Sequence, residues 1–394
     1  MKQEPAASPG TPSLAVLPFE QLDGPTPRYF SDGLAADLGA SLSKIRGLRV
    51  VVCSSHTTTD LRDLAAQLGV RYLLKGRARK PGDQLRITVE IVDGATGGHV
   101  WADMFEGADN EVFDVHDEII EHIVGVVEPS IRRAEIERAR NMRPTSLDAY
   151  ALYLKAVPHV FANTKRDGEK AIRLLSDALK IEPDFLPAHA YAAWCFEQQY
   201  LRNGFDPADR VAALTHADIA LGVNTDDAQA IGIAGFVRAN LTGDYDSALD
   251  VLDRALALNG NSPLTLGFSA LVSAHGERLA RAIEHATRAL RLSLPNDPLN
   301  YHPFCALTVA NLFAADFAEA AKHATSAIRV NPAFSIAHAY LVTSLVRLGK
   351  IEAARQAATR LLELDPAFTV DGFGMGRAAQ IEMIADALRR AGVP

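Results

Sequence analysis

Pairs of small residues seven positions apart recur along the last two thirds of the chain, and they restrict its fold more than any other feature. The second members of successive pairs lie 42, 35, 34, 38 and 34 residues apart. A spacing near 34 is typical of paired-helix repeats, in which small side chains allow two helices to cross closely. The six pairs are Ala171/Ala178, Ala213/Ala220, Ala248/Ala255, Ala282/Ala289, Ala320/Ala327 and Ala354/Leu361.

The ends of these repeats also match one another. Three of the repeats end at a proline, namely Pro183, Pro332 and Pro366. Proline cannot continue the preceding helix. Residues 145–368 therefore resemble an array of about six tetratricopeptide (TPR) repeats. The resemblance implies helix pairs that stack into a superhelix, because no single pair can bury its apolar face.

Two segments depart from the regular repeat. The second repeat carries about eight extra residues around Leu201 to Asp209, which predict a loop. Residues 369–394 predict a loop and a final amphipathic helix that caps the open end of the superhelix. Within that loop, Gly372–Gly376 is glycine-rich but lacks the Gly-Lys-Ser/Thr of a phosphate loop, so a flexible connector is predicted.

The amino-terminal third has a different pattern. Residues 1–12 have the composition of a flexible linker. Residues 13–140 alternate between strand and helix periodicity in the order β-α-β-α-β-β-β-α, which predicts one α/β domain. Right-handed crossovers place its first three strands parallel, with the last two antiparallel beside them. Pro129 is expected to break or kink the last helix, which starts near Val112. The predicted fold is thus an α/β domain followed by an all-α TPR superhelix.

Several separated motifs in this domain occur together in order and spacing. They are Leu14–Phe19, Tyr29–Leu34, Gly69–Gly76, Asp93–Gly97 and Val100–Asp103. Together they resemble the TolB-like (FlgO-related) amino-terminal domain over most of residues 13–140. The resemblance implies a regulatory protein, because this domain commonly sits between TPR repeats and a class III nucleotide cyclase or winged-helix output domain.

Composition excludes several classes of partner. The net charge is -8 and neither half of the chain is basic, so binding to nucleic acid is not expected. No run reaches the ~18 apolar residues of a membrane span, and no secretory signal is recognised at the start. Cys53, Cys195 and Cys305 are too few and too far apart for a disulfide framework. These features predict a cytoplasmic protein and make a periplasmic one the less favoured alternative.

Histidine is frequent, but its pattern does not predict a metal site. His216, His285 and His323 occupy the same position in three repeats. Equivalent positions of a solenoid lie roughly 10 Å or more apart, too far to share one metal ion. They are expected to be semi-buried packing residues. No catalytic motif is found either, so catalytic, cofactor and metal residues are all predicted to be absent.

The α/β domain offers two weaker candidates. Lys75, Arg77 and Arg79 share one face of a predicted strand, which favours charges that protect a sheet edge over a phosphate or lipid patch. An enzymatic or ligand-sensing site could instead lie at the carboxyl ends of the parallel strands, where open sheets bind ligands. The residues that would gather there are Asp23, Asp32, Ser54 and His56.

The first helices of the repeats are expected to line an apolar concave groove. Such a groove suits an amphipathic helix of a partner, the chain's own flanking segment, or a second copy in a homodimer. Replacing Phe268 or Phe313 with Asp is expected to abolish partner capture while the fold survives. The predicted groove residues are Val237, Leu241, Leu264, Phe268, Leu271, His275, His302, Cys305, Val309, Phe313, Tyr340 and Arg347.

These observations predict a non-enzymatic scaffold or regulatory protein. A protein or peptide partner would occupy the TPR groove, and the resemblance places this activity in bacterial signalling that involves a cyclase or a transcription regulator. The alternative is an enzyme or small-ligand sensor whose site lies at the carboxyl edge of the α/β sheet.

Overall fold

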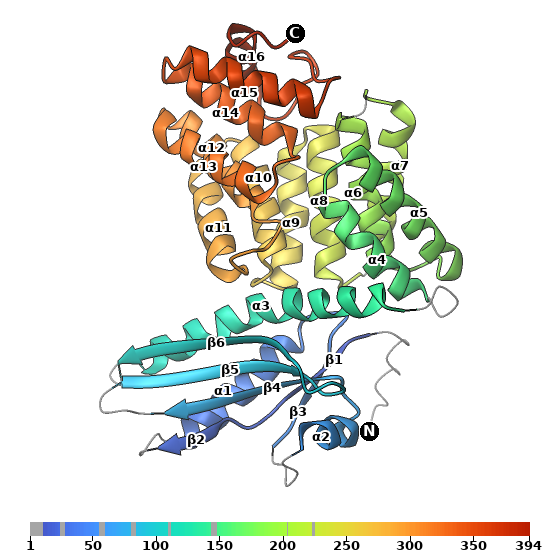
Figure 1. Ribbon diagram of the computed structural model, residues 1–394, viewed down its shortest axis with the longest axis vertical. Coiled ribbons are helices and arrows are strands. Elements are labelled where there is room, and N and C mark those ends of the chain that lie inside the picture. Colours follow the sequence, from blue (N-terminus) through green and yellow to red (C-terminus); the bar gives the residue numbers. More distant parts are fainter. Residues whose placement is uncertain are drawn as a thin grey trace. The chain divides into compact units, whose positions relative to one another are not determined.

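The computed structural model describes residues 11–23, 28–54, 60–79, 84–108, 112–142, 148–202, 204–222 and 225–394 of the chain. The chain forms two compact units, Met1–Ser146 and Leu147–Pro394 (Figure 1). Of the predicted linker at residues 1–12, only residues 11 and 12 belong to the described part. The predicted fold class, an α/β unit followed by a TPR-like superhelix, is confirmed.

The first unit contains a sheet of order β3-β1-β4-β5-β6, with the short strand β2 paired to β4. Strand β1 is parallel to both β3 and β4, whereas β4, β5 and β6 are antiparallel. This arrangement confirms the predicted strand directions, although β2 was not predicted. The strands are β1 (Ser13–Val16), β2 (Glu20–Asp23), β3 (Arg49–Val52), β4 (Tyr72–Arg79), β5 (Gln84–Asp93) and β6 (His99–Ala108).

Three helices cover this sheet. Helices α1 (Arg28–Leu42) and α3 (Val112–Arg140) pack on one face, where Leu38, Tyr72 and Ile123 belong to one buried cluster. The short helix α2 (Leu61–Leu68) covers part of the other face. It begins at Asp60, whose carboxylate accepts hydrogen bonds from two backbone N–H groups, and ends at Gly69 in the left-handed conformation.

Helix α3 continues through Pro129, so of the two predicted effects, a break or a kink, the break does not occur. Val127 and Ile131 on either side of the proline are both buried in the core of the sheet. Farther along α3, the buried carboxylate of Glu135 accepts a 2.6 Å hydrogen bond from the Tyr72 hydroxyl of β4. These contacts on both sides of Pro129 offset the lost backbone hydrogen bond.

The basic residues of β4 do not protect a sheet edge, which corrects the earlier expectation. Strand β4 lies inside the sheet, between β1 and β5. Lys75 forms a 3.0 Å ion pair with Glu90 of β5, and Arg77 forms a 3.3 Å ion pair with Glu20 of β2. These charges are therefore paired across neighbouring strands instead of forming a basic patch.

In its described residues, the second unit contains six consecutive helix pairs and a final helix, α16 (Ala378–Arg390). All twelve members of the recurring small-residue pairs are 3% exposed or less, as close helix crossings require. The paired helices are α4 (Ala149–Phe161), α5 (Lys165–Ile181), α6 (Leu186–Arg202), α7 (Pro207–Ala220), α8 (Ala228–Thr242), α9 (Tyr245–Leu258), α10 (Pro263–His275), α11 (Leu279–Leu292), α12 (Tyr301–Phe313), α13 (Phe317–Val330), α14 (Ser335–Arg347) and α15 (Ile351–Leu364).

The extra residues of the second repeat are only partly a loop. Helix α6 extends to Arg202, and α7 already begins at Pro207, with Asp206 as its N-cap. The prediction of a loop from Leu201 to Asp209 is therefore wrong at both ends. Asp206 explains the second boundary, because its carboxylate accepts a 2.9 Å hydrogen bond from the Ala208 N–H and Pro207 is favoured at the first helical position.

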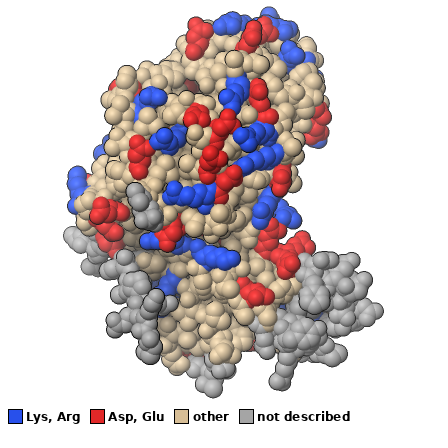
Figure 2. Space-filling view, turned by 180° about the vertical axis from the view of Figure 1, so that it is seen from behind, with Lys and Arg blue, Asp and Glu red and all other residues tan. Residues whose placement is uncertain are grey.

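Charges on the surface are mixed in sign. Figure 2 shows Lys and Arg interspersed with Asp and Glu over the face that is drawn. Several charged residues of the second unit pair between neighbouring repeats, such as Arg278 with Asp246 at 2.6 Å and Arg281 with Asp253. A face with charges mixed in this way does not attract polyanions.

Candidate functional site

Ten of the twelve predicted groove residues are buried, so they do not form an open surface. Each of the ten is 8% exposed or less, whereas Phe313 is half-buried and Arg347 is exposed. The expectation of an open apolar groove is corrected accordingly. The buried ten are Val237, Leu241, Leu264, Phe268, Leu271, His275, His302, Cys305, Val309 and Tyr340.

The first reason for this burial is that the first helices of successive pairs meet through aromatic rings. Phe268 of α10 stacks on Phe236 of α8 with ring centroids 4.2 Å apart. Its other neighbours are Trp194 of α6 at 5.2 Å and His302 of α12 at 4.9 Å. Four helices thus contribute to one aromatic cluster. Such a cluster stabilises the interior and leaves no space for a partner helix.

The second reason is that the superhelix turns tightly enough for distant repeats to touch. Asn163, just after α4, donates a 3.2 Å hydrogen bond to the Tyr301 hydroxyl of α12. Asn331, just after α13, donates a 3.2 Å hydrogen bond to the Phe161 carbonyl of α4. The first helix pair therefore contacts the fifth pair directly.

The third reason is the segment of residues 366–377, which we call the strap. The Gly376 N–H donates a 2.7 Å hydrogen bond to the Tyr245 hydroxyl of α9, and Arg377 forms a 3.0 Å ion pair with Asp246. Phe373 is buried, with its ring 6.2 Å from that of Tyr340. The chain's own flanking segment, one of the three predicted occupants, therefore lies against the predicted groove residues, whereas a flexible connector was expected at Gly372–Gly376.

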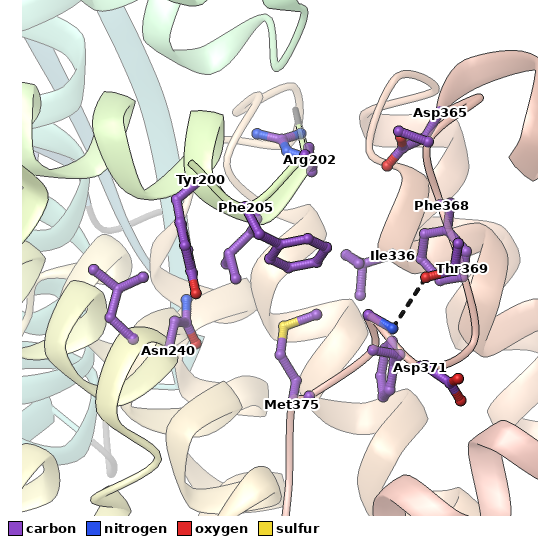
Figure 3. A pocket seen from close by; sticks show the side chains of 17 residues that line it. Tyr200, Arg202, Phe205, Asn240, Ile336, Asp365, Phe368, Thr369, Asp371 and Met375 are labelled. Carbon is purple, nitrogen blue, oxygen red and sulfur yellow. Dashed lines mark hydrogen bonds between the residues drawn. The ribbon is translucent and has the colours of Figure 1, made fainter. Parts of the chain in front are cut away.

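A pocket remains between the strap and helices α6, α8 and α14 (Figure 3). Its volume is about 360 Å³. Of the predicted groove residues, only Leu241 lines it. The lining residues are Tyr200, Leu201, Arg202, Gly204, Phe205, Asn240, Leu241, Ile336, Asp365, Ala367, Phe368, Thr369, Asp371, Gly372, Phe373, Gly374 and Met375.

Arg202 is the central charged residue of this interior. It lines the large pocket and two smaller neighbouring cavities of about 30 and 160 Å³. Its guanidinium donates hydrogen bonds to the Asn163 carbonyl at 3.3 Å and to Asn163 Oδ1 at 2.9 Å, and it lies 5.7 Å from the Phe334 ring centroid. Burial lowers the pKa of Arg202, because the low-dielectric interior disfavours its charge.

Two carboxyl groups near Arg202 also have shifted pKa values. Glu197 is 3% exposed and accepts a 2.7 Å hydrogen bond from Asn240 Nδ2. Burial raises the pKa of Glu197 to about 7 despite this bond. Burial also raises the pKa of Asp365, which accepts a 3.5 Å hydrogen bond from the Ser335 hydroxyl. Both groups therefore hold their protons more tightly than exposed carboxyls do.

The three equivalent histidines are half-buried, as predicted. One of them, His216, lies with its Nδ1 2.8 Å from Nδ1 of His189 and stacks on the Phe196 ring. Burial, with a smaller contribution from His189, lowers the pKa of His216 to about 4. Among the described residues, no three His, Cys, Asp or Glu side chains are grouped as a metal site would require.

Three histidines with strongly lowered pKa values, His216, His275 and His302, make stability depend on pH. Burial lowers the pKa of His216 and His275 to about 4 and that of His302 to about 3. The unfolded chain therefore binds more protons than the folded chain below pH 6.5, and stability falls as the pH decreases. From pH 7 to pH 5 we expect the three to cost roughly 5 kcal/mol together. The raised pKa of Glu197 has the opposite effect and increases the free energy of unfolding by about 2 kcal/mol over the same pH range.

Urea unfolding of the full chain at pH 7 and pH 5 measures this balance. We expect a net loss of about 3 kcal/mol at pH 5. In the Glu197→Gln variant the opposing contribution is absent, so the loss should increase to about 5 kcal/mol. Equal stability of the wild-type chain at the two pH values would contradict the buried, neutral state of these histidines.

The alternative site in the α/β unit cannot be assembled from the described side chains. Ser54 is described and exposed, but the side chains of Asp23, Asp32 and His56 lie outside the described part. That site remains a prediction.

Sequence reasoning missed Arg202, Asn240 and the strap. The available signal was the insertion around Leu201 to Asp209, since it lengthens α6 and places Phe205 in the pocket. Helix α6 and the strap are more than 160 positions apart, so their proximity could not be inferred from periodicity.

Two family models match parts of the chain. Residues 10–122 match the model described as HilA/YgeH-like transcriptional regulator, second domain. Residues 242–298 and 310–367 match the tetratricopeptide repeat model. The TPR resemblance is thus confirmed, whereas the model that matches the first unit has a different description from the TolB-like domain.

The chain is also similar to two named bacterial proteins. It is 31% identical over 235 residues to the putative adenylate cyclase 3 of Rhizobium meliloti (strain 1021), which covers 58% of this chain and 40% of that protein. It is 23% identical over 252 residues to the transcriptional regulator HilA of Salmonella typhimurium, which covers 59% of this chain and 42% of the regulator. The chain therefore spans about two fifths of the length of these relatives.

Solved structures show more distant likeness. The crystal structure of the APC/C hetero-tetramer Cut9–Hcn1 matches with a TM-score of 0.46 at 18% identity, covering 72% of this chain and 49% of that chain. The type IV pilus biogenesis factor PilW matches with a TM-score of 0.39 at 19% identity, covering 56% of this chain and 94% of that chain. In the part of the chain that the structure describes, every helix is too short or too polar to cross a membrane.

Proposed function

We propose that this chain is a non-enzymatic regulatory region of a bacterial signalling protein, and that its TPR unit binds a polypeptide segment. The observation that carries the proposal is the strap. Residues 366–377 form a polypeptide segment that already lies against the helix pairs, with Phe373 beside Tyr340 of α14 and the Gly376 N–H bonded to Tyr245 of α9. In this proposal a partner segment takes the place of the strap when the strap is released.

The similarity to named relatives supports the regulatory part of the proposal. One relative is called a putative adenylate cyclase and the other a transcriptional regulator, so the output under control is proposed to be one of these two kinds. The motifs of residues 13–140 support a relationship to the TolB-like domain as well. Three buried free cysteines favour a reducing compartment, the cytoplasm.

A fluorescent peptide with the sequence of residues 366–377 tests polypeptide binding. In the full-length Phe373→Asp variant the strap should leave its site, because a charge cannot replace a buried ring. We expect this variant to bind the peptide at micromolar concentration and the wild-type chain to bind it at least tenfold more weakly, since the intact strap competes.

A peptide that carries Phe373→Asp is the matched control and should not bind to either chain. Fluorescence anisotropy measures all four combinations. If the variant chain keeps its wild-type stability and shows no preference for the unmodified peptide, this site does not take up polypeptide.

A further inference from the structure

The pocket under the strap has the composition of a small-molecule site. Its volume of about 360 Å³ lies in the range of ligand pockets, which combine an apolar wall with a few polar groups. Phe205, Ile336 and Met375 line the pocket at the centre of the view in Figure 3, with Arg202 above them and Asn240 at the lower left. Residues of the strap, α6, α8 and α14 all contribute to its wall.

Arg202 has donors left over for a ligand. A guanidinium carries five N–H donors, and among the described residues Arg202 donates hydrogen bonds only to the two Asn163 oxygens. Among the described residues, no carboxylate forms an ion pair with it. Burial raises the pKa values of the nearby carboxyls of Glu197 and Asp365. A partly buried guanidinium with unused donors, and with no carboxylate at ion-pair distance among the described residues, favours an anionic ligand.

Two further observations point to a ligand. Asn240 Oδ1 is buried and has no hydrogen-bond partner among the described residues, and such an atom is costly unless a ligand or water satisfies it. Phe205 has a φ of 59°, a conformation that bulky residues rarely adopt. The strained backbone holds its ring in the pocket wall, 5.5 Å from the Tyr200 ring and against Gly372 of the strap.

We propose that this pocket binds a small amphipathic organic acid, whose carboxylate pairs with Arg202 and whose apolar body packs against Phe205, Ile336 and Met375. The pocket volume suits a body of roughly eight to twelve carbon atoms. This proposal does not rest on polypeptide binding by the TPR unit, because the pocket exists with the strap in place.

Three probes with the same ten-carbon chain separate the contribution of the ligand's charge to affinity from that of its apolar body. They are decanoate, 1-decanol and decylamine. They are titrated into the full-length chain below their micelle concentrations, with calorimetry and thermal shift as the readouts. We expect saturable one-to-one binding of decanoate, and at least tenfold weaker binding of the neutral and cationic probes. A probe of the same length without a carboxylate leaves Arg202 unpaired.

Three variants locate the site. Arg202→Gln should lose at least tenfold in decanoate affinity, whereas the control Arg210→Gln should keep wild-type affinity. Arg210 is likewise partly buried and bonded to a backbone carbonyl, that of Leu241 at 3.0 Å, but it does not line the pocket. Met375→Trp should abolish binding by filling the pocket, with circular dichroism showing that the chain remains folded.

Any one of three results would overturn the proposal. They are the absence of saturable decanoate binding to the wild-type chain, equal affinities for decanoate and decanol, and an Arg202→Gln affinity equal to that of Arg210→Gln. None of these measurements uses the peptide. The organic-acid proposal can therefore fail while the proposal of polypeptide binding stands, and the reverse.

Discussion

Phe268→Asp is expected to unfold the TPR unit. From the sequence alone, this change was expected to abolish partner binding and leave the fold intact. In the structure, however, Phe268 is 0% exposed and lies among the rings of Trp194, Phe236 and His302. Removing a buried phenylalanine costs about 3–5 kcal/mol, and the unpaired carboxylate adds to this cost. The sum is comparable to the whole stability of a domain, about 5–15 kcal/mol.

Phe313→Asp is the matched comparison. Phe313 is half-buried near the end of α12, so we expect this variant to lose only about 1–2 kcal/mol and to remain folded. Circular dichroism with thermal and urea unfolding distinguishes the two variants. A folded Phe268→Asp chain with the stability of the Phe313 variant would show that the aromatic cluster does not hold the four helices together.

Ala320→Trp is the second change with a large expected effect. Ala320 is 0% exposed in α13, at a position where every repeat has alanine. An indole there would force two helices apart, and overpacking of even a few carbon atoms costs about 1–3 kcal/mol. Because each pair is stabilised mainly by its neighbours, the defect should propagate to α12 and α14 and unfold the array.

Two further variants of α13 test whether the loss of stability depends on the position and the size of the new side chain. Ala318 is exposed, so Ala318→Trp should leave the unfolding midpoint nearly unchanged. Ala320→Leu should be intermediate between wild type and Ala320→Trp. If the Ala318 and Ala320 tryptophan variants unfolded at the same temperature, the small residue at position 320 would not be a packing requirement.

The local elements could be predicted because their signals lie within one or two turns of chain. Asp60 and Gly69 mark the ends of α2 by hydrogen bonding and by backbone freedom, and both effects are properties of adjacent residues. At Pro129 the predicted break does not occur, because burial of Val127 and Ile131 outweighed a local preference. The prediction failed at β4, since the position of a strand within its sheet depends on pairing partners.

The candidate site could not be predicted in the same way. Arg202 and Asn163 were not expected to meet, and the strap was expected to be a connector. These contacts join residues that are tens to more than a hundred positions apart, as in the hydrogen bond of Gly376 to Tyr245. Small changes in the angle between successive pairs accumulate along a solenoid, and they decide whether the first and fifth pairs touch.

The amino-acid order by itself determined that alanines every 34 residues or so would stack helix pairs, because the crossing of two adjacent helices depends on side-chain volume at known positions. It also determined the alternation of strands and helices before residue 140, since periodicity is a local property. Only the tertiary structure decided that the interior is closed by aromatic rings and by the strap, leaving a pocket beside Arg202. Curvature is the physical reason, because it arises from all the helix crossings together and no short stretch of sequence contains it.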